Sequence, residues 1–124
     1  MVINKVQGKI YQGCKSACDN VYDEVPQAPL FPCITIGDIT IEDVESKADI
    51  WLYRYNLSAF STYSGKKEVN QIIEDLHECF KYMEGSEVAA STYVGDIKIS
   101  DVNVFRNESV YQGNLVVQIE IIKM

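Results

Sequence analysis

The sequence is poor in the residues that most catalytic and metal-binding sites use. It has a single histidine, His77, and three prolines, and neither of the common glycine-rich phosphate-binding motifs occurs. No apolar run approaches the ~18 residues that a membrane span requires. The first residues, Met1 to Lys5, lack the charged and apolar regions of a signal peptide. We therefore expect no membrane association and no export, and we expect the four cysteines to be thiols.

Basic residues are also scarce. Eleven lysines and arginines face 18 aspartates and glutamates, which gives a net charge of −7. Binding to a nucleic-acid backbone needs clustered positive charge, so the composition argues against it. The acidity has two interpretations, simple solubility or a surface past which DNA slides without sticking. At 124 residues the chain has room for one domain, residues 1–124, whose modest core would gain from association.

The first third of the chain predicts one helix and a long connection. Apolar residues recur at three- and four-residue steps over residues 2–18, which predicts a helix, although Gly8 and Gly13 weaken it. All three prolines follow between Pro26 and Pro32, so this segment should be extended.

The middle of the chain predicts two strands and a helix. Cys33–Gly37 is a short β-branched strand, and residues 39–41 continue its alternation past Gly37-Asp38, as a bulge or as the start of a projecting arm. Residues 42–49 are polar and predict a loop. Residues 50–61 alternate strictly, with Trp51, Tyr53, Tyr55, Leu57 and Ala59 on one face.

The remaining elements follow from the same periodicities. An apolar stripe over residues 64–84 predicts the stronger helix, with Ser64 as its N-cap and Gly85 just after its end. Residues 85–93 predict a polar loop. Two strands then follow, with a bulge at Ser100-Asp101 in the first and a tight connection at residues 107–109 before the second. The expected fold is α+β, an antiparallel sheet of about four strands with two helices packed on one face.

Reactive side chains do not form a recognisable site. His77 and Cys79 are two apart on the predicted helix and do not face each other. A zinc site would need Cys14, Cys18, His77 and either Cys33 or Cys79 to converge, and no short ligand pair favours it over buried cysteines. We expect no metal and no cofactor.

Three further features leave alternatives open. The carboxylates Asp38, Glu42, Asp43 and Glu45 lack calcium-loop spacing, which favours a solvated loop over a calcium site. Ser64-Gly65-Lys66-Lys67 opens a helix, where backbone amides can bind an anion, or where the lysines are simply exposed. The chain has eight tyrosines, which fit sheet packing and a protein interface equally well.

Three segments, in order along the chain, resemble the tail-completion or head–tail joining family of long-tailed phages and prophages. They are Val21–Pro26 leading to Phe31–Gly37, Leu57–Thr62 followed by Tyr63–Glu68, and the closing strand with Gly113-Asn114-Leu115. The chain departs from the family at Cys33, where an aromatic or aliphatic residue is usual, and in the loop of residues 42–49.

The resemblance implies a structural, non-enzymatic virion protein with no catalytic residues. It implies a ring of six copies, made in the host cytoplasm and placed at the head–tail junction or at the head-proximal end of the tail. The ring would contact connector and tail-tube proteins, with DNA as passing cargo. Gly37–Asp49 and Gly85–Asp96 are the candidate arms. From their charge alone, we expect Glu42, Asp43, Glu45 or Glu87 of these arms to line the lumen. The candidate assembly residues are Asp38, Ile39, Ile41, Glu42, Asp43, Glu45, Glu87 and Tyr93.

Two other functions compete with the phage joint. One is a small stand-alone protein-binding module, immunity or regulatory, whose tyrosine-rich sheet face grips one partner. The other is an enzyme that uses Cys79 or His77, which the missing convergent site disfavours.

Overall fold

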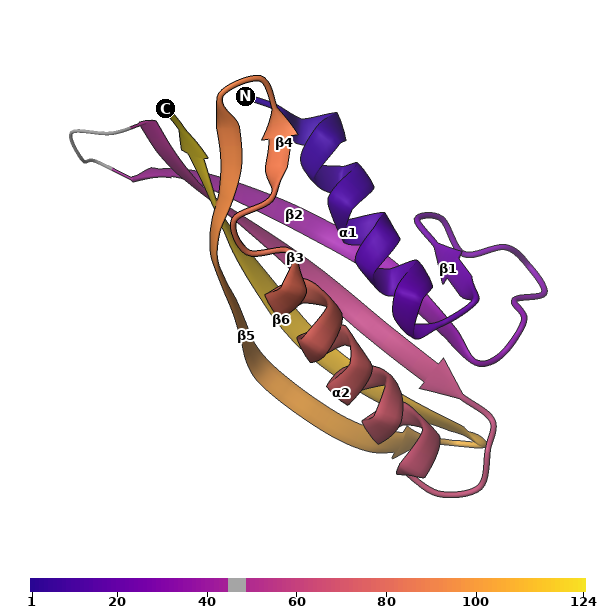
Figure 1. Ribbon diagram of the computed structural model, residues 1–124. Coiled ribbons are helices and arrows are strands. Elements are labelled where there is room, and N and C mark those ends of the chain that lie inside the picture. The colour runs from indigo at the N-terminus through magenta and orange to yellow at the C-terminus, as the bar shows by residue number, and fades with distance from the viewer. Residues whose placement is uncertain (45–48) are drawn as a thin grey trace.

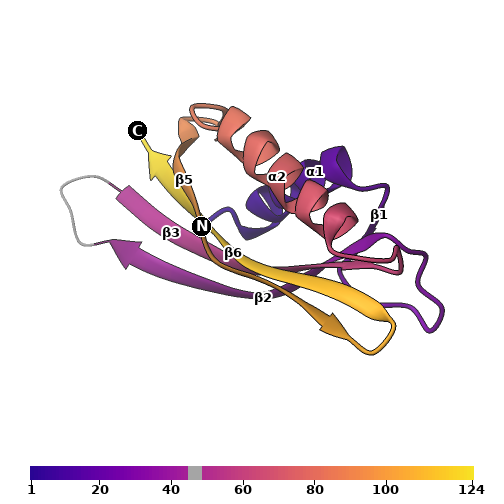
Figure 2. The ribbon, with the colours of Figure 1, turned by 90° about the horizontal axis from the view of Figure 1, so that it is seen from below.

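The computed structural model describes residues 1–44 and 49–124 (Figure 1). The elements follow in the order α1 (Ile3–Ala17), β1 (Asn20–Tyr22), β2 (Cys33–Val44), β3 (Asp49–Ser61), α2 (Lys67–Tyr82), β4 (Glu87–Ala89), β5 (Thr92–Asn107) and β6 (Val110–Lys123). Both helices lie on the same face of one curved sheet, as the sequence predicted (Figure 2). Among the described residues, no helix covers the other face of the sheet.

The sheet has six strands in the order β1-β2-β3-β6-β5-β4. The prediction of about four antiparallel strands was therefore too low, and the sheet is mixed, because β1 pairs with β2 in parallel. The two extra strands are the edge strands β1 and β4, each of three residues. A segment of three residues is too short for side-chain alternation to be recognised in the sequence.

The hairpin between β2 and β3 corrects the predicted loop at residues 42–49. β2 continues to Val44, and Glu42 and Asp43 pair with Leu52 and Trp51 of β3. Polar residues are tolerated here because both are exposed at the edge of the sheet. Glu45, one of the candidate assembly residues, lies outside the described residues.

Bulges bend the two long outer strands. The register of β2 shifts between Ile36 and Ile39, so a bulge does occur at Gly37-Asp38. The predicted bulge at Ser100-Asp101 is confirmed by a register shift and by a φ of +52° at Asp101. A further shift, between Val94 and Ile97, was not predicted. Each bulge increases the local twist and helps the sheet curve around the helices.

The core lies between the helices and the sheet. The predicted apolar face of β3 is confirmed, with Tyr53, Tyr55, Leu57 and Ala59 buried opposite Ile119, Val117, Leu115 and Gly113 of β6. From the helices, Val6, Ile10, Cys14, Val69, Ile72, Leu76 and Phe80 fill the space above. α2 begins at Lys67, and Ser64 is not its N-cap, because Lys66, already helical at φ −88° and ψ −5°, precedes the helix.

Two glycines let α2 pack closely against α1 and against the sheet. A Cβ on Gly13 of α1 would lie 2.5 Å from the Cε1 atom of Phe80 on α2. A Cβ on Gly113 of β6 would lie 2.6 Å from Ile73 and 2.7 Å from Val69, both on α2. Since real Cβ atoms do not come this close to other atoms, α2 is seated over these two glycines.

Candidate assembly surface

Four of the predicted assembly residues lie at one end of the sheet. The cross-strand row Val44, Ile50, Ile122, Tyr93 and Glu87 runs from β2 to β4. Glu42 and Asp43 immediately precede Val44 on the hairpin, which projects beside the C-terminus (Figure 1). The four strand-to-strand steps separate Val44 from Glu87 by roughly 19 Å. The structure thus brings these residues to one end, on opposite edges of the sheet.

The other three described candidates lie further along β2. Asp38 is exposed within the bulge, while Ile39 and Ile41 are half-buried. Ile39 pairs with Tyr55 and Ile41 with Tyr53, so both isoleucines belong to the face that the helices cover. They extend the core toward the outer edge of the sheet and leave part of their surface exposed.

A row of hydrogen-bonded polar side chains, centred on Arg54 of β3, crosses the uncovered face of the sheet. The Nη1 atom of Arg54 lies 3.0 Å from the Oε2 atom of Glu42, and its Nε donates to Gln118 Oε1 at 2.9 Å. Arg54 and Glu42 are both well exposed, so the ion pair adds little stability. It does neutralise Glu42, one of the proposed lumen charges. The partner of Glu42 was not predicted, because strand register cannot be read from one sequence.

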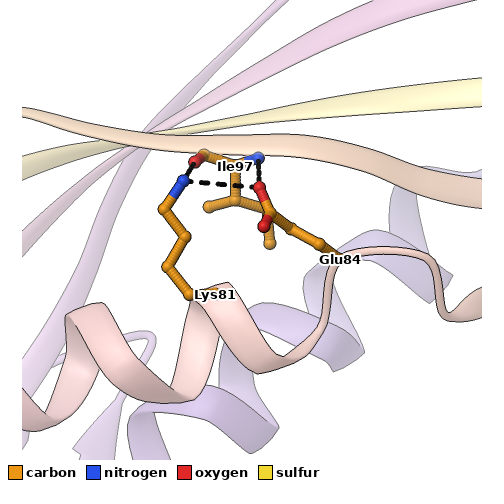
Figure 3. Close-up of polar contacts among 3 residues, drawn as sticks. All are labelled: Lys81, Glu84 and Ile97. Carbon is orange, nitrogen blue, oxygen red and sulfur yellow. Dashed lines mark hydrogen bonds and ion pairs between the residues drawn. The ribbon is translucent and has the colours of Figure 1, made fainter.

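A second feature that the sequence did not predict joins α2 to β5 (Figure 3). Lys81 Nζ donates to the carbonyl oxygen of Ile97 at 2.5 Å, and the Ile97 amide donates to Glu84 Oε2 at 2.8 Å. Lys81 and Glu84 also form an ion pair at 3.4 Å. We call these three residues the edge clasp.

The edge clasp replaces a neighbouring strand. β4 pairs only with Thr92 and Tyr93 of β5, so the backbone of Ile97 extends past the end of β4. Lys81 of α2 supplies the donor, and Glu84, which follows the end of α2, supplies the acceptor that a strand would otherwise provide. The hydrogen bond from the Ile97 amide, together with Lys81, lowers the pKa of the Glu84 carboxyl below its ordinary 4.5.

The reactive side chains are dispersed. His77 is exposed on α2, Cys79 is half-buried, and Cys14 and Cys33 are buried. Burial raises the pKa of Cys14 to about 12 and that of Cys33 to about 11. Across residues 1–44 and 49–124, no three histidine, cysteine or acidic side chains gather as metal ligands. No helix in the same ranges is both long and apolar enough to cross a bilayer.

The start of α2 bears on the two interpretations of Ser64-Gly65-Lys66-Lys67, an anion site or simply exposed lysines. Gly65 has a φ of +99°, and Lys66, already in helical conformation, immediately precedes α2. Ser64, Lys66 and Lys67 are all exposed. This favours the simpler of the two interpretations, exposed lysines at a helix start.

The described residues thus form a small α+β domain, in which two helices cover one face of a curved six-stranded sheet. The sequence profile of the tail completion protein gp17 family matches residues 8–119, and the chain belongs to this family of bacteriophage virion proteins. The resemblance found in the sequence is thereby confirmed.

The fold also occurs in a solved structure. A chain described as "Virion of native gene transfer agent (GTA) particle" superposes with a TM-score of 0.76 at 16% identity, over 98% of each chain. At this identity the likeness establishes a shared fold. The curated proteins that were compared contain no match.

Proposed function

We propose that the chain is a non-enzymatic ring subunit, six copies of which close around the DNA path at the head–tail junction or at the head-proximal end of the tail. The observation that carries this proposal is family membership over residues 8–119. A structural role in tail completion is common to the family. The ring, its copy number and its position are our inference.

The geometry supports a ring subunit in two ways. The sheet is a single curved layer backed by both helices, which gives a stiff body with two distinct edges. A ring needs such a heterologous contact, in which one surface of each copy meets a different surface of the next. The paired end of β2 and β3, at Val44 and Ile50, supplies a surface for contacts with connector or tail-tube proteins.

The acidic residues of the arms support a lumen that does not retain DNA. Asp43 and Glu87 are exposed at the same end of the sheet, near the ion-paired Glu42. Carboxylates facing a DNA path would repel the phosphate backbone and prevent adhesion.

Deletion of the gene in the producing cell tests the structural role. We expect filled heads and separate tails to accumulate, with joined particles restored by the wild-type chain supplied in trans. Intact infectious particles without the chain would contradict the proposal. Electron microscopy of the restored particles then counts the copies in the ring.

Charge removal tests the lumen separately. Conversion of Glu42, Asp43, Glu45 and Glu87 to the corresponding amides should slow DNA passage and reduce infectivity. The matched control converts four carboxylates away from the arms and the sheet edges, namely Asp19, Asp23, Glu24 and Asp75. Equal infectivity of the two variants would contradict the lumen assignment and leave the structural role intact.

A further inference from the structure

Both long outer strands are open along part of their length. β1 covers β2 only at Cys33–Thr35, so β2 has no neighbouring strand on its outer side from Ile36 to Val44 within the described chain. β5 is covered at Thr92 and Tyr93 by β4, at Val94 by Gly85 and Ser86, and at Ile97 by the edge clasp. Beyond Ile97, the described chain places no strand beside β5 as far as Asn107. We call residues 36–44 and 98–107 the two free edges.

The backbone of each free edge faces outward at alternate residues. Ile97 directs its amide to Glu84 and its carbonyl to Lys81, away from β6. Antiparallel pairs alternate between hydrogen-bonded and non-hydrogen-bonded, so Ile119 opposite it bonds instead to Tyr53 of β3. Tyr53 then does not bond to Ile41, its partner on β2. The amides and carbonyls of Ile39, Ile41 and Asp43 therefore point out of the sheet, ready for an added strand.

Apolar side chains flank both free edges. On β2, Ile39 and Ile41 are half-buried beside the helix-covered core. On β5, Ile99 and Val104 are half-buried and Val102 is 49% exposed. Ile99 and Val102 line a shallow groove against Ile73 and His77 of α2. An added strand would bring these two apolar margins together and remove both from water.

Charge selects which edge pairs with which. β2 carries Asp38, Glu42 and Asp43 and no basic residue. Pairing of two β2 edges would place carboxylates opposite one another, which is destabilising. The free edge of β5 carries two basic residues, Lys98 and Arg106, against one carboxylate, Asp101. The favoured neighbour of the β2 edge is thus the β5 edge of a second copy.

We propose that the free edge of β2 in one copy adds as an antiparallel strand to the free edge of β5 in the next, and that the edge clasp marks where this pairing ends. The contact is head-to-tail and leaves an unpaired edge on each side, so it propagates until a ring closes. This proposal rests on the proposed ring and specifies the surfaces that form it.

Thiol cross-linking with two variants, each of which adds one exposed cysteine while the buried Cys14, Cys18 and Cys33 are kept, tests the pairing. The substitutions are Thr40→Cys on β2 and Asn103→Cys on β5. Both native residues are exposed and lie near the middle of the two free edges. Both are made in a Cys79→Ser background and carry different tags. Treatment of the mixture with a short bifunctional thiol reagent, for the purified chain and for assembled tails, should give covalent heterodimers. The double variant should give a ladder that ends at the ring size.

The outcomes separate the pairing from the ring. Homodimers of the Thr40→Cys variant as the main product would show that two β2 edges meet, and would overturn the proposal. Rings seen by native mass spectrometry or electron microscopy without cross-links would overturn the pairing and leave the proposed function standing. Absence of both rings and cross-links in assembled tails would overturn both.

A proline substitution gives an independent test. Asp43 is exposed, and its amide points outward, so Asp43→Pro removes a donor that the monomer does not use. Asp43→Ala is the matched control, because it removes the same charge and keeps the amide. We expect Asp43→Pro to match the control in circular dichroism and melting temperature but to lose assembly. Normal assembly of a folded Asp43→Pro variant would contradict the proposal.

Discussion

Two glycines of α1 should respond in opposite ways to the same substitution. Gly8 and Gly13 are both inside the helix, where alanine is favoured over glycine by about 1 kcal/mol. A Cβ on Gly8 meets no atom within 4 Å, whereas on Gly13 it would lie 2.5 Å from the ring of Phe80, which is fully buried. Gly8→Ala should therefore stabilise the protein, while Gly13→Ala also overpacks the contact between the helices.

The difference between the two variants isolates the packing cost. The gain in helix propensity is nearly the same at both sites, so it cancels. What remains is the overpacking penalty, about 1–3 kcal/mol. With an unfolding entropy of about 2.1 cal/mol/K per residue, each kcal/mol shifts the melting temperature of a chain of this length by about 4 °C. The melting temperatures of the two variants should thus differ by about 4–12 °C.

Calorimetry and urea denaturation, at a concentration where the chain is monomeric, measure this difference. A Phe80→Leu substitution provides the coupling test, because a smaller side chain should reduce the cost of Gly13→Ala in a double-mutant cycle. If Gly13→Ala stabilises the protein as much as Gly8→Ala does, the two helices are not in the close contact described, and the reasoning fails.

Three further predictions concern ionisable and polar groups. The folded-state pKa of Glu84 is lowered, so its stabilisation is present above pH 4.5 and lost as the pH falls through the folded value; Glu84→Gln should flatten this part of a stability–pH profile. The buried Tyr55 hydroxyl has no hydrogen-bond partner among the described residues, so Tyr55→Phe should leave the urea midpoint unchanged or raise it, and a large fall would reveal a missing partner. Native alkylation at pH 8 should modify Cys79 first and Cys14 and Cys33 only on unfolding, as mass spectrometry of the peptides would show.

The parts of the fold that the sequence predicted are those with a long one-sided pattern. Tyr53, Tyr55 and Leu57 alternate with polar residues, and this alternation correctly gave the buried face of β3. The bulge at Ser100-Asp101 was predictable because the alternation changes phase there. Periodicity succeeds in these places because burial on one face is what creates the pattern.

The elements that could not be predicted from the sequence depend on backbone pairing between strands or on side chains far apart in the sequence. β1 and β4 have three residues each, too few for a pattern. Ser64 matched a common N-cap, yet the helix begins three residues later, after Gly65 turns the chain with a positive φ. The edge clasp was equally hidden, because it depends on the backbone of Ile97 leaving the reach of β4.

The candidate assembly residues were also predicted only in part. Glu42, Asp43, Glu87 and Tyr93 were chosen as parts of two polar arms, and the sheet places them at one end. Ile39 and Ile41 proved to be partly core residues, since each pairs with a buried tyrosine. The sequence suggested which segments are exposed, but only strand order and register show which edges remain open for a neighbour.

Cryo-electron microscopy of particles that contain a tagged copy of this chain tests the proposed ring directly. We expect a closed ring of six copies at the head-proximal end of the tail or at its junction with the head, with DNA in the lumen. A single unringed copy, or density at the capsid shell or the distal tail tip, would contradict it.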